Sequence, residues 1–148
     1  IFKSKNILIL DSISDPGNMG TIIRTADWFG FNHVFLSENC VEVYNSKVVA
    51  ASMGSVFNIS INPDASLKKL IKDLKEEGYK IVVTDLMGDD FDLNKKDNIA
   101  LVIGNEAKGV DRKLMAMADK RLKIMKSGKA ESLNAAVAAG IIMNKIKF

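Results

Sequence analysis

The sequence is poor in the residues that build disulfide frameworks and metal sites. It has one cysteine, one histidine and two prolines in 148 residues. A single cysteine excludes an intramolecular disulfide framework and a cysteine-based zinc site, and a single histidine disfavours sites that need two. No apolar run reaches the roughly 18 residues of a membrane span, and residues 1–10 lack the long apolar core of a signal peptide. We therefore expect a cytoplasmic protein with no membrane segment and no metal.

The composition that remains is typical of a folded domain. Hydrophobic residues make up 47% and charged residues 26% of the chain, which excludes a disordered polymer. The length suits one domain, so we expect residues 1–148 to form a single unit. The chain begins with Ile1 rather than methionine, which predicts that it is part of a longer protein.

The net charge of +3 conceals an uneven distribution along the chain. Residues 1–107 hold 11 basic and 15 acidic residues, whereas residues 108–148 hold 10 basic and three acidic ones. Residues 120–129 contain five basic residues and no acid. Such a run is either a solvated face whose lysine stems cover apolar surface or a patch that faces phosphates.

Apolar runs of strand length alternate with helical patterns. The runs, which suit strands buried on both faces of a parallel sheet, are residues 7–10, 33–36, 81–83 and 99–103. Helical spacing of apolar residues is found at 20–29, 66–77 and 132–146. This alternation predicts an α/β fold with a mostly parallel sheet flanked by helices. The polar stretch 89–98 is predicted to be a loop.

The first unusual motif, residues 11–30, lies between a predicted strand and a predicted helix. Ligands of open α/β sheets gather at such positions. Pro16 and Gly17 form a turn signal, and Asn18 and Arg24 follow it. Asn18 could simply cap the helix, and a lone helical arginine such as Arg24 is usually a surface ion pair.

Two further motifs follow later in the chain. Gly104–Gly109, with the sequence GNEAKG, directly follows a predicted strand, and its glycines allow backbone to approach a ligand closely. It lacks the spacing of a Walker A loop and of a Rossmann glycine motif. Residues 124–134 read IMKSGKAESLN and lead into the last predicted helix. Glu131 and Ser132 could be ordinary residues of a helix N-terminus, and Asn134 an exposed residue without a role.

The three motifs together are far more specific than any one of them. In order and separation they resemble the SpoU (TrmH-like) RNA ribose 2′-O-methyltransferases of the SPOUT superfamily. The shared pattern is Asp-Pro-x-Asn-x-Gly-x-x-x-Arg-x-Ala-x-x-Phe-Gly, then Gly-Asn-Glu-x-x-Gly, then Gly-x-x-Glu-Ser-Leu-Asn. Residues 47–55 also look like the family's Ser-x-Gly-Ala segment. The resemblance extends from about Ile7 to Met143.

The resemblance implies a fold and a cofactor that periodicity could not reveal. Family members have a deep trefoil knot at the C-terminal end, which would be formed here by residues 104–109 and 124–134. The knot binds S-adenosyl-L-methionine, and two chains pair around it as a homodimer. Many members carry a separate N-terminal RNA-binding domain, which fits a start at Ile1. The cofactor-binding residues implied by the resemblance are Gly104, Ile124, Met125, Ser132 and Leu133.

The resemblance also implies catalytic residues and a substrate. The catalytic set is Arg24, Asn18, Glu106, Ser132 and Asn134. Because a guanidinium normally stays protonated, we expect Arg24 to stabilise developing oxyanion charge or to hold a phosphate. The other four would orient the ribose and Arg24 by hydrogen bonds, and Glu106 is a candidate partner of Arg24, in the same chain or across the dimer. The substrate would be structured RNA, with rRNA favoured over tRNA, contacted by Arg24, Lys126 and Lys129.

Two other functions compete with methyl transfer. Where the family usually has Ile-Pro-Met, this chain has Ile124-Met125-Lys126, which loosens the loop and adds charge beside the pocket. That departure permits a non-catalytic RNA-binding or dimerisation module that retains the fold. A nucleotide- or phosphate-binding enzyme unrelated to methyl transfer is disfavoured by the lack of P-loop and Rossmann spacing.

Overall fold

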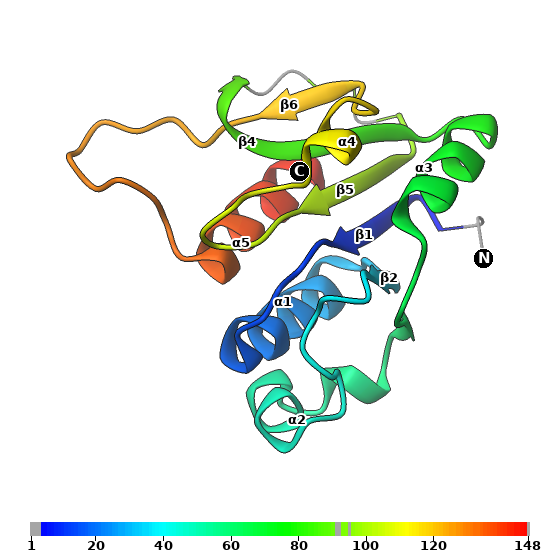
Figure 1. Ribbon diagram of the computed structural model, residues 1–148, viewed down its shortest axis with the longest axis vertical. Coiled ribbons are helices and arrows are strands. Elements are labelled where there is room, and N and C mark those ends of the chain that lie inside the picture. Colours follow the sequence, from blue (N-terminus) through cyan, green and yellow to red (C-terminus); the bar gives the residue numbers. More distant parts are fainter. Residues whose placement is uncertain (1–3, 91–92, 95, 148) are drawn as a thin grey trace.

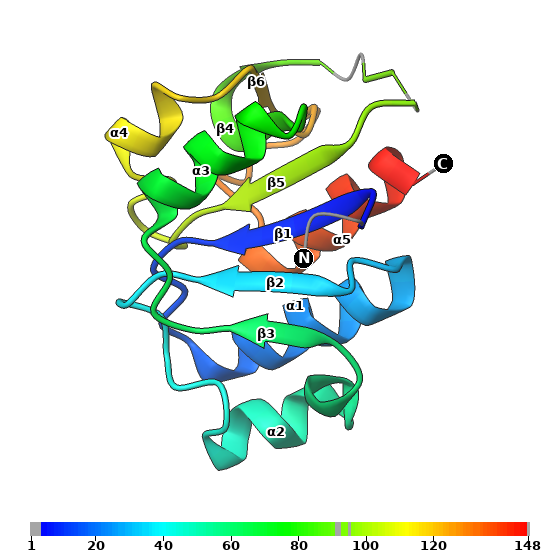
Figure 2. The ribbon, with the colours of Figure 1, turned by 90° about the vertical axis from the view of Figure 1, so that its right-hand side faces the viewer.

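Six parallel strands form one sheet in the order β3-β2-β1-β5-β4-β6 (Figures 1 and 2). A computed structural model describes residues 4–90, 93–94 and 96–147. The elements in chain order are β1 (Asn6–Leu10), α1 (Pro16–Phe29), β2 (His33–Leu36), α2 (Ser46–Ser52), η1 (Ser55–Phe57), β3 (Ser60–Asn62), α3 (Leu67–Glu76), β4 (Lys80–Asp89), β5 (Ile99–Ile103), α4 (Arg112–Met115), β6 (Lys120–Leu122) and α5 (Ala135–Lys147). The predicted α/β class with a parallel sheet is confirmed.

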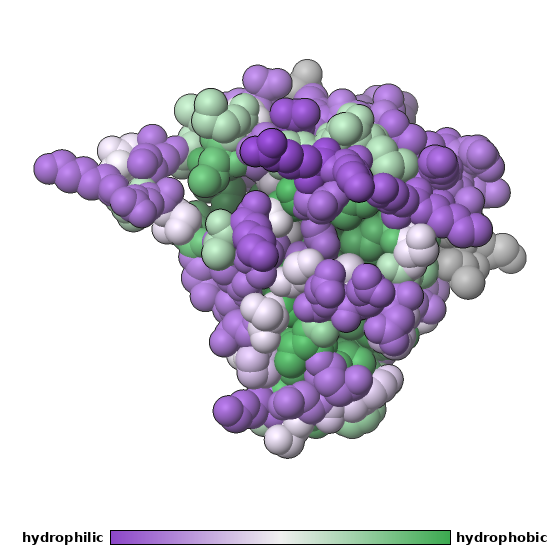
Figure 3. All heavy atoms as spheres, in the orientation of Figure 1, coloured by the Kyte–Doolittle hydropathy of each residue, from purple (hydrophilic) through white to green (hydrophobic). Residues whose placement is uncertain are grey.

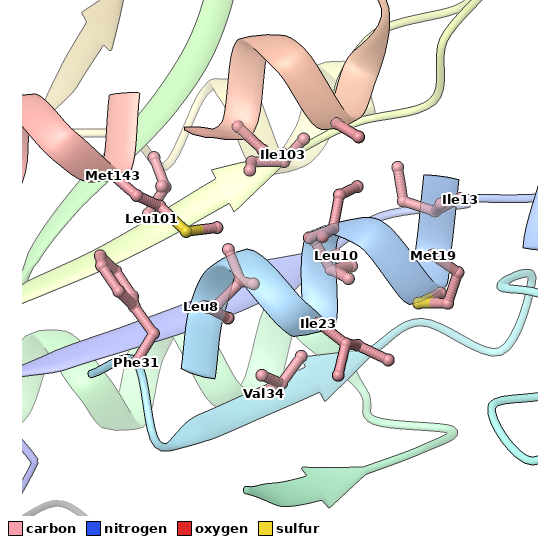
Figure 4. Packing of buried hydrophobic residues seen from close by; sticks show 14 of the residues in the cluster. Leu8, Leu10, Ile13, Met19, Ile23, Phe31, Val34, Leu101, Ile103 and Met143 are labelled. Carbon is pink, nitrogen blue, oxygen red and sulfur yellow. The ribbon is translucent and has the colours of Figure 1, made fainter. Parts of the chain in front are cut away.

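The central strands are almost entirely apolar because helices cover both faces of the sheet. Every residue of β1 and β5 is buried. Successive side chains of a strand point to opposite faces: Leu8 and Leu10 pack with α1, α2 and α5, whereas Ile7 and Ile9 pack with α3 and α4. Figure 4 shows the first of these two layers, in which Ile23 of α1 and Met143 of α5 approach the strands.

The strand order has a switch point between β1 and β5. From β1 the chain proceeds by α1 to β2 on one side, whereas β5 and β4 lie on the other side. The order therefore reverses between β1 and β5, and ligands of such sheets bind outside the carboxyl ends of the strands at this point. The segments that follow β1 and β5 are the first and second motifs.

Helix boundaries differ from the prediction at both ends of the chain. α1 begins at Pro16 rather than residue 20, because the Asp15 carboxylate accepts a hydrogen bond from the Asn18 backbone N–H at 2.8 Å and proline suits the first helical position. Asn18 therefore does not cap α1. α5 begins at Ala135 rather than residue 132, which leaves Ser132 in the preceding segment. Gly30 closes α1 with a φ of +74°.

Several short elements had no counterpart in the prediction. These are α2, η1, β3, α4 and β6. Residues 89–98 were predicted as a loop, but Asp89 belongs to β4, and residues 91, 92 and 95 lie outside the described part of the chain. None of the helices in the described ranges combines the length and apolar character needed to cross a bilayer.

Candidate active site

A cavity of about 620 Å³ opens at the carboxyl ends of β4, β5 and β6. Its walls come from the end of β4, from the loop after β5 and from the segment between β6 and α5. That segment, residues 123–134, projects away from the body in Figure 1, and Figure 3 shows apolar surface in the hollow beside it. The volume lies within the range of about 300–1,000 Å³ that small-molecule sites occupy.

All five residues predicted to bind a cofactor line this cavity. They are Gly104, Ile124, Met125, Ser132 and Leu133. Gly104 is buried, and a Cβ atom there would lie 2.2 Å from the Gly109 carbonyl carbon and from the Val110 nitrogen. The loop closes on itself through paired backbone hydrogen bonds between Asn105 and Gly109, at 2.8 and 3.1 Å. The strand end and the loop therefore approach so closely that only glycine fits.

A chain of side-chain hydrogen bonds joins the three motifs. Asn134 caps α5, because its Oδ1 accepts from the Ala136 N–H at 2.9 Å. This orientation leaves its Nδ2 to donate to Asn18 Oδ1 at 2.9 Å, and Asn18 Nδ2 in turn donates to Glu106 Oε1 at 2.9 Å. The side-chain amides of Asn134 and Asn18 each have one possible orientation in this hydrogen-bond network, because each oxygen accepts and each nitrogen donates. Three predicted catalytic residues from distant parts of the sequence are thus brought together.

Exchanging Asn18 for aspartate should destabilise this network more than removing its side chain. Asn18→Asp replaces the donating Nδ2 with a carboxylate oxygen that faces Glu106. We expect Asn18→Ala to lower the free energy of unfolding by about 1 kcal/mol and Asn18→Asp by about 1 kcal/mol more, because of like-charge repulsion. Urea denaturation measures both variants, and added salt should narrow the difference. Equal stabilities at low salt would contradict this geometry.

Two residues that the sequence analysis did not select hold the loops in place. Asn105 donates from Nδ2 to the Ser12 carbonyl at 2.8 Å, and its Oδ1 accepts from the Ala107 N–H at 2.9 Å. The buried Asp11 carboxylate accepts from the Asp111 N–H at 2.8 Å. The segment after β1 is therefore fastened to the segment after β5. A charged residue directly after the apolar run 7–10 was the available signal for Asp11.

The predicted RNA-binding residues, Arg24, Lys126 and Lys129, make no hydrogen bond with this network among the described residues. Arg24 is exposed on α1, and it makes no hydrogen bond or ion pair with the part of the chain that the structure describes. Glu106 bonds to Asn18 and not to Arg24. Lys126 donates to the Ala130 carbonyl at 3.0 Å, and Lys129 is exposed on the same projecting segment.

The end of β4 contributes cavity residues that motif analysis missed. Thr84, Asp85, Leu86 and Met87 all line the cavity. They follow the apolar run 81–83, and the carboxyl end of a buried parallel strand is where such residues could have been sought. Within the described ranges, no group of three His, Cys, Asp or Glu side chains is arranged to hold a metal ion.

A sequence profile of the SpoU rRNA Methylase family matches residues 5–144. The chain belongs to the SpoU methylase family. It is 36% identical over 146 residues to the 23S rRNA (guanosine(2553)-2′-O)-methyltransferase RlmP of Bacillus subtilis, covering 97% of this chain and 58% of that protein. The chain thus spans somewhat more than half the length of this relative.

Solved structures of SpoU methyltransferases share the fold. AviRb from Streptomyces viridochromogenes, solved in complex with AdoMet, superposes with a TM-score of 0.89 at 30% identity, covering 99% of this chain and 58% of that one. An AdoMet-bound rRNA methyltransferase from Sinorhizobium meliloti gives 0.88 at 35% identity, covering 95% and 55%.

Proposed function

We propose that this SpoU domain, residues 1–148, transfers a methyl group from S-adenosyl-L-methionine to a ribose 2′-hydroxyl of structured RNA, with rRNA favoured over tRNA. The observation that carries the proposal is the hydrogen-bonded chain Asn134–Asn18–Glu106. It joins all three family motifs, and Glu106 also lines the cavity. The name of RlmP, which specifies 2′-O-methylation of 23S rRNA, supports the same reaction. An RNA substrate of this kind favours a cytoplasmic location.

The cavity fits S-adenosyl-L-methionine in size and in chemistry. Its walls combine apolar side chains such as Ile103 and Ile124 with backbone groups of the Gly104–Gly109 loop. Gly104, Ile124, Met125, Ser132 and Leu133 would hold the cofactor. AdoMet-bound relatives of the same fold support this assignment. When bound, the cofactor supplies a methyl group already activated by a positively charged sulfur, so the protein's own residues must deal with the weakly acidic hydroxyl.

Polar side chains at the cavity and on α1 can orient the ribose and stabilise negative charge on its hydroxyl oxygen. Glu106 presents a carboxylate that Asn18 holds in one orientation, and Ser132 adds a hydroxyl on the opposite segment. We assign both to orienting the ribose by hydrogen bonds. Arg24 supplies a positive charge that would stabilise the developing oxyanion or an adjacent phosphate.

The knot and the dimer that the resemblance implies are part of the proposal. Residues 104–109 and 124–134, the proposed knot segments, both contribute to the cavity walls. Arg24 and Trp28 lie one turn apart on the exposed side of α1, and Trp28 is 84% exposed. A second copy that covered this side could bring Arg24 to the Glu106 of its partner. Sedimentation velocity measures the association directly.

The projecting basic segment should contribute to RNA affinity through phosphates. If Lys126 and Lys129 each neutralise one phosphate, the slope of log affinity against log salt concentration should be less negative by about 1.4–1.8 in the double alanine variant. Affinity should fall alike for all RNA sequences, as measured by filter binding. The matched control is Lys68→Ala with Lys72→Ala on α3, across the sheet, which should leave the slope unchanged. Equal slopes for both double variants would contradict the assignment.

Calorimetry with S-adenosylhomocysteine tests the proposed function most directly. We expect saturable binding by the domain, and then ribose methylation that depends on S-adenosyl-L-methionine when rRNA is supplied. Mapping ribose methylation in RNA from cells with and without the gene would identify the nucleotide. No binding at millimolar ligand would favour the non-catalytic RNA-binding module instead.

A further inference from the structure

The pairing of β4 with β6 is interrupted where β4 reaches the cavity. Thr84 and Asp89 both pair with Leu122 of β6, so residues 85–88 have no partner in β6 and form a bulge between them. Leu86 and Met87, within this bulge, are 76% and 87% exposed, and both line the cavity. Bulges occur preferentially beside active sites, where they redirect side chains.

Several contacts hold the bulge in a defined shape. The Asp85 carboxylate accepts from the Met87 N–H at 3.0 Å. Gly88 lies so close to β6 that a Cβ atom would be 2.7 Å from the Arg121 carbonyl oxygen. Beyond the bulge, the Lys123 N–H donates to the Asp89 carbonyl at 3.0 Å. These contacts therefore fix the shape of the bulge in the cavity wall.

Asp85 is the acidic residue of this bulge, and it lines the cavity. Its side chain is only 13% exposed, and it lines the cavity beside Leu86, Ile103 and Ile124. The Met87 N–H is its one hydrogen-bond donor among the described residues. Arg121 Nη1 is 3.9 Å from Asp85 Oδ2, which provides charge compensation but exceeds hydrogen-bond distance. An ionised carboxylate accepts several hydrogen bonds, so this one retains unused acceptor capacity.

The positive charge of Arg121 decides which hydrogen-bond donor of a ligand suits the Asp85 carboxylate. Arg121 already compensates part of the charge of Asp85, so a ligand ammonium would gain less from this carboxylate and would also lose its own hydration. A hydroxyl is a neutral donor, so it is less affected by the neighbouring cation and costs less to desolvate. In dinucleotide-binding folds, an acidic residue likewise hydrogen-bonds a ribose hydroxyl of the bound nucleotide. Leu86 and Met87 add apolar surface on which the rest of a nucleoside can lie.

We propose that Asp85 determines specificity for the nucleoside end of the cofactor, by accepting hydrogen bonds from its ribose hydroxyls, with Leu86 and Met87 against the nucleoside. This inference rests on the proposed function, since it takes S-adenosyl-L-methionine as the occupant of the cavity. It assigns a role to a segment that belongs to none of the three motifs.

Calorimetry with two ligands tests the role of Asp85. The probes are S-adenosylhomocysteine and its 2′,3′-dideoxy analogue. The wild-type domain should bind the first about 10–100 times more tightly, as a hydrogen bond to a charged acceptor implies. Asp85→Ala should reduce this ratio to less than about 3. Asp85→Asn, whose amide oxygen can still accept from the Met87 N–H, should give an intermediate ratio. Asp89→Asn, an exposed acid on the same strand, is the matched control and should keep the wild-type ratio.

A third probe separates the ribose from the amino-acid end of the ligand. 5′-Methylthioadenosine keeps the ribose but has no ammonium group. If Asp85→Ala weakens it and S-adenosylhomocysteine by the same factor, the inference is supported. Weakening of S-adenosylhomocysteine alone would show that Asp85 contacts the ammonium and would overturn it, as would an unchanged ribose preference in Asp85→Ala. Wild-type protein that binds no S-adenosylhomocysteine would instead overturn the proposed function and this inference with it. Should Asp85→Ala fail to fold in a thermal melt, the ratio of Asp85→Asn decides.

Discussion

Gly104→Ala is expected to abolish S-adenosylhomocysteine binding and to lower the free energy of unfolding by about 3 kcal/mol, at the upper end of the usual cost of overpacking. The added Cβ would lie 2.2 Å from the Gly109 carbonyl carbon and the Val110 nitrogen. These are backbone atoms, and the loop they belong to is closed by two hydrogen bonds between Asn105 and Gly109. The loop cannot yield without losing those bonds, and its displacement would reshape the cavity wall.

A second glycine of the same cavity provides the control for this prediction. Gly128 also lines the cavity, but no atom lies within 4 Å of a Cβ built there. Gly128→Ala should therefore keep both the stability, measured by urea denaturation, and the affinity, measured by calorimetry. If Gly104→Ala behaved like Gly128→Ala, the close approach of the strand end and the loop would be refuted.

The central strands could be predicted from the sequence, whereas the edges of the sheet could not. β1 and β5 are buried on both faces, so their apolar runs are unbroken. β3 and β6 have three residues each, and β6 contains Lys120 and Arg121, so no apolar run marks it. At an edge, pairing with one neighbour supplies the hydrogen bonds that define the strand, and composition carries little information.

The site was predictable as a set of motifs but not as a network. The resemblance to the SpoU family grouped Asn18 and Glu106 as parts of one site. The resemblance could not show that Asp15, rather than Asn18, caps α1 and so frees the Asn18 amide to bridge Asn134 and Glu106. Nor could it reveal Asp85, because the bulge depends on how β4 pairs with β6.

Arg24→Ala should reduce the rate of methyl transfer by about 10²–10³, the usual effect of removing one group that stabilises developing negative charge. The affinity for S-adenosylhomocysteine should stay within about a factor of two, because Arg24 is not among the residues that line the cavity. Single-turnover rates at saturating RNA and S-adenosyl-L-methionine measure the first quantity, and calorimetry the second.

The conservative variant Arg24→Lys separates charge from geometry. Lysine keeps the positive charge but lacks the planar fork with which a guanidinium binds two oxygens at once. We therefore expect a rate between those of wild type and Arg24→Ala if Arg24 holds a phosphate or oxyanion through paired hydrogen bonds. Lys72→Ala on α3, which also removes one exposed positive charge but lies across the sheet from α1, should leave the rate unchanged. Loss of S-adenosylhomocysteine binding in Arg24→Ala would contradict this role, since it would make Arg24 a cofactor-binding or structural residue rather than one that acts on the ribose.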